Sequence, residues 1–201
     1  MTGSDAPSGP FDGRVLRRER NVDAVIDAVL EMFAEESLFP TIEQAAVRSG
    51  LSLRSLYRYF ADPAELLEAT IARSRDRGIE ASHLEAIGQG TSAARIDDFV
   101  TMRIRLHDTV GPIYRATVAN AARLPRIRDE LTKNRNDLRE QFELQFAPEL
   151  SALKPAERAV ALSAGDLLTQ LDSIEFLRRH RSLSVAETGE VLRSTLRSLL
   201  G

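Results

Sequence analysis

The chain has 201 residues, of which 43% are hydrophobic and 28% charged, as in an ordinary globular protein with a sizeable core. It has no cysteine and no apolar run of about 18 residues, which excludes disulfides, thiolate metal sites and a membrane-spanning helix. The net charge of −3 excludes a uniformly basic nucleic-acid binder but leaves room for a local basic face. Because residues 1–12 also lack the basic and apolar regions of a secretory signal, we expect a cytoplasmic protein with no membrane partner.

The remaining pattern predicts an all-α protein. Residues 1–13 are rich in glycine, proline and small polar side chains, which is typical of a disordered N-terminal arm. From about 17 to 36 an apolar stripe at helical spacing predicts the first long helix, and two shorter helices are expected between 39 and 60. Long amphipathic segments follow, separated by glycine or proline, at roughly 63–82, 92–109, 112–123, 125–146, 155–180 and 184–200.

Several helix starts carry a local signal. Three pairs have the spacing of a capping box, in which the first side chain covers a free backbone N–H and the third residue after it reaches back: Thr41 with Gln44, Asp62 with Glu65, and Ser184 with Glu187. Proline, which suits the first position of a helix, occurs at Pro63, Pro125 and Pro155. We therefore expect helices to begin at these points.

Residues 41–60 read TIEQAAVRSGLSLRSLYRYF and match the helix-turn-helix pattern. The first short helix begins at Thr41 and ends at Gly50, a residue that readily adopts the left-handed backbone, and Ser52 caps the second. In the second helix the spacing assigns one set to the core (Leu53, Leu56, Tyr57, Phe60) and another to the surface (Arg54, Ser55, Arg58, Tyr59). Guanidinium and hydroxyl groups suit phosphates and base edges in a major groove. On these features alone, a packing hairpin with a solvated arginine face remains an alternative.

The N-terminal sixty residues resemble the DNA-binding domain of the TetR family of transcriptional regulators. The motifs that carry this resemblance are T-I-x-x-A-A-x-x-S-G-L-S, L-Y-R-Y-F and D-P-x-E-L-L; the rest of the chain agrees in length and helical layout only. The resemblance implies a three-helix helix-turn-helix DNA-binding domain over 14–62, followed by a helical-bundle ligand-binding and dimerisation domain over 63–201. It also implies a homodimer that binds double-stranded operator DNA and is released from it by a small effector, repression being the family default.

The resemblance also assigns roles to particular residues. It implies that Thr41 contacts phosphate, that the recognition helix is led by Ser52, Leu53, Arg54 and Ser55, and that Tyr57 and Tyr59 place hydroxyls on the DNA backbone. Arg58 completes the expected DNA-binding set. The sequence departs from the family at Arg54, where a small residue is usual, and at Pro63, where a phosphate-binding lysine is usual.

For the C-terminal part, we expect a ligand cavity within 99–176 and dimerisation through the last two helices, at about 155–180 and 184–200. Rings and a flexible methionine suit the border of an irregular apolar cavity, and the candidates are Phe99, Met102, Leu106, Tyr114, Val118, Phe142, Phe146 and Leu171. The alternative is that these residues are simply core. Since cysteine is absent and histidine scarce, we expect a mostly apolar organic effector and no metal.

Other features give weaker signals. Glu80 and His83 have a Glu-x-x-His spacing, but a di-iron bundle needs two such motifs and the chain has one. No catalytic set and no cofactor motif stands out, so we expect no enzyme, the alternative being an all-α enzyme or adaptor without DNA binding. Four arginines lie close together near the N-terminus, at Arg14, Arg17, Arg18 and Arg20. They indicate either a DNA-contacting extension or a solvated helix start.

Overall fold

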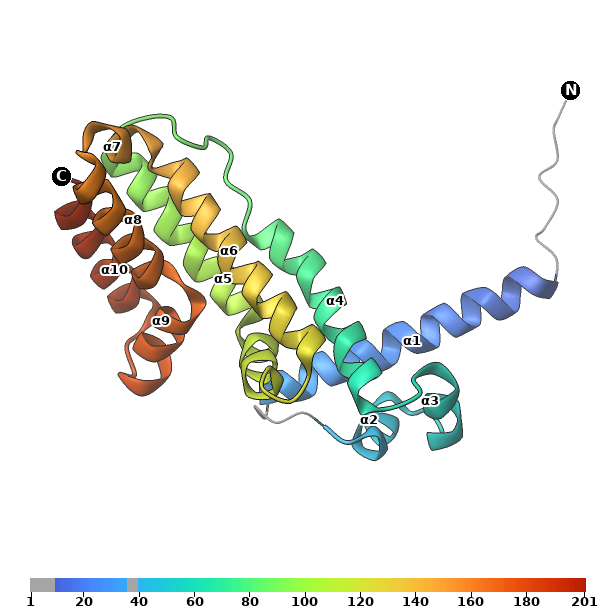
Figure 1. Cartoon of the computed structure of the whole chain (residues 1–201). Helices are drawn as coiled ribbons and strands as arrows, with labels where there is room; N and C mark the ends of the chain where they lie inside the picture. The colour runs from blue at the N-terminus through green and yellow to red at the C-terminus, as the bar shows by residue number, and fades with distance from the viewer. Residues whose placement is uncertain (1–9, 36–39) are drawn as a thin grey trace, which may run out of the picture. The chain divides into compact units, whose positions relative to one another are not determined.

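The computed structural model describes residues 10–35 and 40–201, with the side chains of Pro10–Asp12 and Ala34 left out. It confirms the all-α prediction: no strand occurs within those residues (Figure 1). The elements are α1 (Pro10–Glu35), α2 (Ile42–Ser49), α3 (Leu53–Tyr59), α4 (Pro63–Ala81), α5 (Ser92–Asn120), α6 (Pro125–Gln145), α7 (Ala147–Ala152), α8 (Pro155–Thr169), α9 (Leu171–Glu175), the π-helical turn η1 (Phe176–His180) and α10 (Val185–Leu200). None of these helices has both the length and the hydrophobicity needed to cross a bilayer.

The chain forms two compact units, Met1–Arg73 and Ser74–Gly201. The division falls inside α4, whereas the sequence suggested a boundary where α4 begins. An ion pair between Arg73 on α4 and Asp23 on α1 joins the first half of α4 to the N-terminal unit. Of the predicted N-terminal arm, residues 1–9 lie outside the described residues, and residues 10–13 form the first turn of α1.

The N-terminal unit has a core to which four helices contribute. Its buried side chains include Val29 and Phe33 on α1, Ile42 on α2, Leu56 on α3 and Leu66 on α4. The predicted cap and glycine turn define where α2 begins and ends. The side chain of Thr41 accepts a hydrogen bond from the Gln44 N–H while Gln44 reaches back to Thr41, and Gly50 ends α2 with a positive φ of 70°.

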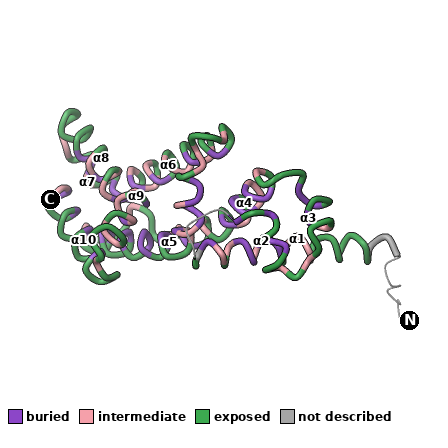
Figure 2. Tube along the Cα trace, turned by 90° about the horizontal axis from the view of Figure 1, so that it is seen from below, coloured by how far each residue is buried: buried purple, intermediate pink, exposed green. Residues whose placement is uncertain are grey.

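The second unit is built around α5, which is buried along most of its length on the faces that contact α6, α9 and α10 and exposes one polar face. Figure 2 shows buried positions recurring along α5 and on one side of α6. Three fully buried rings meet edge to face or tilted: Phe99 lies 5.7 Å from Phe142 and 5.1 Å from Phe146 between ring centroids. These rings form part of one apolar core to which α5, α6, α7, α8 and α10 contribute.

Two predicted helix boundaries were wrong. A break was expected at Gly111-Pro112, yet α5 continues through both residues. Pro112 removes one helical hydrogen bond, but Gly111 and Ile113 beside it are buried, and this packing maintains the helix. Conversely, the segment predicted as one helix over 155–180 breaks at Gln170, whose backbone is extended. The Gln170 amide donates to the carbonyl of Arg135, which anchors this break to α6.

Gly165 on α8 offers a test of this packing. A Cβ atom built there would collide with the ring of Phe142, which is fully buried and cannot move aside freely. We expect Gly165→Ala to lower the free energy of unfolding by about 1–3 kcal/mol, the usual cost of overpacking a core. Gly111→Ala is the matched control, because its Cβ would meet neighbours at an ordinary 3.6 Å. Urea denaturation followed by circular dichroism would measure both, and equal midpoints would contradict the packing described.

Candidate DNA-binding surface and ligand cavity

The helix α3 is fixed at its start by side-chain capping. The Ser52 hydroxyl oxygen accepts a hydrogen bond from the Ser55 N–H at 3.2 Å, and the two hydroxyls lie 3.0 Å apart. Leu56 anchors the helix in the core, while Arg54 and Arg58 are exposed. The helix therefore presents two guanidinium groups and two hydroxyls on a rigid support.

The structure reverses the predicted positions of the two tyrosines. Tyr57, expected in the core, is 50% exposed, and Tyr59, expected on the surface, is 8% exposed. The Tyr59 oxygen accepts hydrogen bonds from the Asn21 amide on α1 and from the Arg58 guanidinium, each at 3.0 Å, and these bonds lower the pKa of Tyr59. The helical wheel took Phe60 as part of the helix, whereas Phe60 is extended and the buried face of α3 is formed by Leu56 and Tyr59; Leu53, also expected in the core, is 39% exposed. The family resemblance, unlike the helical wheel, implies an exposed Tyr57.

Three other charged side chains of this unit, Arg48, Asp62 and Glu65, are already bonded within the protein. The Nη2 atom of Arg48 on α2 lies 2.5 Å from Oε1 of Glu35 and 3.6 Å from Oε2 of Glu31. Both glutamates belong to α1, so Arg48 contributes to the packing of α1 on α2. At the start of α4, the Asp62 carboxylate accepts from the Glu65 N–H at 2.9 Å, and the Glu65 carboxylate accepts from the Ala61 N–H at 2.5 Å. The helix start that lacks the usual lysine is thus capped by two carboxylates, a poor environment for a phosphate.

Most residues predicted to line a ligand cavity lie in the core. Phe99, Phe142 and Phe146 pack against one another. A second buried cluster contains Leu106, Tyr114 and Leu171. Val118 is 39% exposed. Tyr114 does bring its hydroxyl to a polar partner, donating to Asp172 at 2.7 Å, and burial together with this carboxylate raises the pKa of Tyr114.

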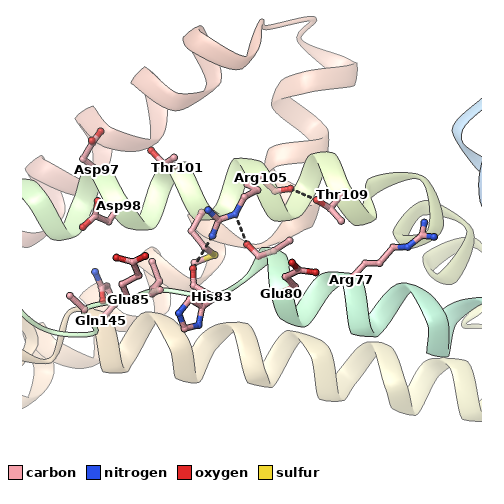
Figure 3. A pocket seen from close by; sticks show the side chains of 14 residues that line it. Arg77, Glu80, His83, Glu85, Asp97, Asp98, Thr101, Arg105, Thr109 and Gln145 are labelled. Carbon is pink, nitrogen blue, oxygen red and sulfur yellow. Dashed lines mark hydrogen bonds between the residues drawn. The ribbon is translucent and has the colours of Figure 1, made fainter.

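A cavity of about 790 Å³ lies in the second unit, between the end of α4, the following residues 82–86 and α5 (Figure 3). Of the predicted ligand-binding residues only Met102 lines it. Its wall contains four carboxylates (Glu80, Glu85, Asp97, Asp98), two arginines (Arg77, Arg105), two further polar side chains of α5 (Thr101, Thr109), and the apolar Ala81, Leu84 and Met102. The sequence prediction assigned the cavity to apolar residues, whereas the structure lines it largely with the polar face of α5.

Some charged side chains of this wall are bonded within the protein, and others are not. Arg105 donates from Nε to the Ala81 carbonyl at 2.9 Å and from Nη2 to the His83 carbonyl at 2.8 Å. Asp97 accepts from Arg193 of α10 at 2.6 Å. Among the described residues, no side-chain hydrogen bond or ion pair involves Glu80, Glu85 or Asp98, so these carboxylates are available to a ligand. Although Glu80 and His83 both line the cavity, no group of three metal-ligating side chains forms in the described part of the chain.

No protein-family model matches the sequence, and no curated protein matches it. The structure resembles that of EbrR, described as a multidrug binding protein, in a crystal structure complexed with imidazole. The TM-score is 0.60 at 18% sequence identity, and the match covers 92% of this chain and 90% of that chain. This likeness confirms the fold class, an N-terminal helix-turn-helix unit followed by a helical bundle.

Proposed function

We propose that the protein is a ligand-responsive DNA-binding transcriptional regulator, a repressor that a small organic effector releases from its operator. The observation that carries the proposal is the presentation of Arg54, Tyr57 and Arg58 on α3, a capped helix joined to α2 by the Gly50 turn. In a helix-turn-helix protein, side chains near the start of the second helix reach base edges while the flanking groups contact phosphates. Thr41, exposed at the start of α2, is placed for such a phosphate contact.

Arg54 is the residue with which we test this proposal. If its guanidinium reads guanine, Arg54→Ala weakens binding by about 1–3 kcal/mol and relaxes preference at one base pair. Fluorescence anisotropy with duplexes from the DNA flanking the coding region, compared with single-base variants of the best binder, measures both effects. Arg48→Ala is the control, because Arg48 is engaged by α1 carboxylates. Unchanged affinity for every sequence would rule out the role of Arg54, and absence of any duplex binding by the wild-type chain would favour an enzyme or adaptor.

We further propose a homodimer through the last helices, in which only the large apolar side chains left exposed on them meet a second copy. Leu171, Ile174, Leu192 and Leu196 are buried within the chain, so they are not free to meet a second copy. The apolar side chains left exposed on α8, η1 and α10 are Val160, Leu167, Phe176, Val185 and Val191. Such a set on neighbouring helices suits a two-fold four-helix interface, which can place two recognition helices about 34–36 Å apart for successive major grooves.

Leu167 is 71% exposed, so its replacement tests the interface without disturbing the core. We expect Leu167→Glu to convert the dimer to a monomer in sedimentation at micromolar concentration, because the mutation would bury a carboxylate in an apolar interface. The control is Leu144→Glu, which introduces the same change at a 51% exposed position on α6 and should leave the dimer intact. A dimer that persists in Leu167→Glu would overturn this assignment of the interface.

For the effector, the cavity beside α4 and α5 replaces the apolar interior as our proposed site. Its free carboxylates, Glu80, Glu85 and Asp98, favour a positively charged ligand, and Leu84 and Met102 offer apolar contact. We therefore propose an organic cation with an apolar part in place of the mostly apolar molecule expected from the sequence. The multidrug binding reported for EbrR, a protein of similar fold, supports a ligand in the helical bundle.

Phenyltrimethylammonium is a suitable probe, with neutral tert-butylbenzene as its isostere. We expect the cation to bind more tightly than the isostere, and the Glu80→Gln/Asp98→Asn variant to weaken cation binding by about two- to fivefold per carboxylate. Calorimetric titration measures these differences. Glu140→Gln is the control, since Glu140 is exposed on α6 and does not line the cavity. Equal affinities for the cation and the isostere would contradict the charge-based assignment.

A further inference from the structure

The first helix extends well beyond the part that packs. It begins at Pro10, residues 13–20 are all exposed, and the first fully buried side chain is Val25. Figures 1 and 2 both show this N-terminal portion of α1 projecting past α3 within the same unit. Because most helical stability in proteins comes from packing, this extension is not accounted for by the core of the unit.

One face of the extension is basic. Arg14, Arg17, Arg18 and Asn21 occur at i, i+3, i+4 and i+7, the spacing that places side chains on one side of a helix. The face meets α3 at its C-terminal end: the Asn21 amide donates to the Tyr59 oxygen at 3.0 Å, and the Arg18 guanidinium lies 6.0 Å from the Tyr59 ring centroid. The arginine face, defined as Arg14, Arg17 and Arg18, therefore continues from the surface that α3 presents.

The charges of this face are not neutralised inside the described part of the chain. None of the ion pairs found there involves Arg14, Arg17 or Arg18, and both Arg14 and Arg17 are exposed. Three positive charges gathered on one exposed face with no carboxylate partner among the described residues point to an external polyanion.

We propose that the arginine face of α1 is a second DNA-contacting element, which binds the phosphates flanking the base pairs that α3 reads. This inference rests on the proposed function, since it takes α3 as the element in the major groove. A helix rises about 1.5 Å per residue, so the face from Arg14 to Arg18 spans roughly 6 Å. Phosphates of one strand follow at about 3.4 Å along the duplex axis, so this length corresponds to about two phosphate steps.

The experiment compares two operator duplexes, selected in vitro with the wild-type full-length protein from a random library. One contains only the selected base pairs, and the other adds about six flanking base pairs on each side. We expect Arg14→Ala/Arg17→Ala to bind the short duplex like wild type and to lose the extra affinity of the long one. On the long duplex, the slope of log affinity against log salt concentration should fall in magnitude by about 1.8 for each bound protomer, or about 3.6 for the proposed dimer, at 0.9 per lost contact.

Arg20→Ala is the control, because it removes one positive charge from the same helix at a guanidinium that already donates to the Leu16 carbonyl. Circular dichroism should show the helical content retained in all variants, since alanine is the strongest helix former. Equal salt slopes for wild type and Arg14→Ala/Arg17→Ala on the long duplex would overturn this inference alone. If the wild-type chain selects no duplex, the proposed function fails and the inference fails with it.

Discussion

The helical bundle depends on one constraint: one face of α5 is covered by α6, α9 and α10, so the polar side chains on that face cannot rely on water and must find partners inside the protein. Each partner comes from a different neighbour. Arg95 Nη2 lies 2.5 Å from Oε1 of Glu149 on α7, and His107 Nε2 lies 2.9 Å from Oε2 of Glu175 on α9. Because breaking one side of such a buried pair leaves an uncompensated polar group, these contacts fix where α7 and α9 lie along α5. Apolar packing supplies the stability of the bundle, and the polar contacts specify its arrangement.

The same constraint applies most strongly to Arg103, a charged side chain that is fully buried. Burial lowers the pKa of Arg103 to about 9, which still leaves the guanidinium protonated at neutral pH. Its hydrogen bonds go to the Leu138 carbonyl at 2.6 Å and to the Gln141 amide oxygen at 2.8 Å, and its charge lies 4.5 Å above the centre of the Phe99 ring. Since both hydrogen-bond acceptors belong to α6, a displacement of α6 along α5 would leave a buried cation without partners. We infer that α5 and α6 move together.

The sequence predicted what local chemistry decides. The caps at Thr41 and Ser184 were found because the interacting groups are three residues apart, and both form as expected. The continuity of α5 through Pro112 was missed because burial on both sides of the proline outweighs a local helix-breaking signal. The site was predicted least well. Tyr59 was misplaced because its partner Asn21 is 38 residues distant in the chain. The cavity was missed because it depends on how the end of α4 approaches α5.

The division of the chain inside α4 bears directly on regulation. The first half of this helix belongs to the N-terminal unit, where Arg73 pairs with Asp23, and its last residues, Glu80 and Ala81, line the cavity of the second unit. A ligand can shift an equilibrium only through contacts that differ between two states. A cation held by Glu80 would make such contacts on a helix that is covalently continuous with the N-terminal unit. In the proposed regulator, α4 therefore takes part both in ligand binding and in the packing of the N-terminal unit. The ligand site and the DNA-binding surface are coupled only if these contacts favour one position of α4 over another.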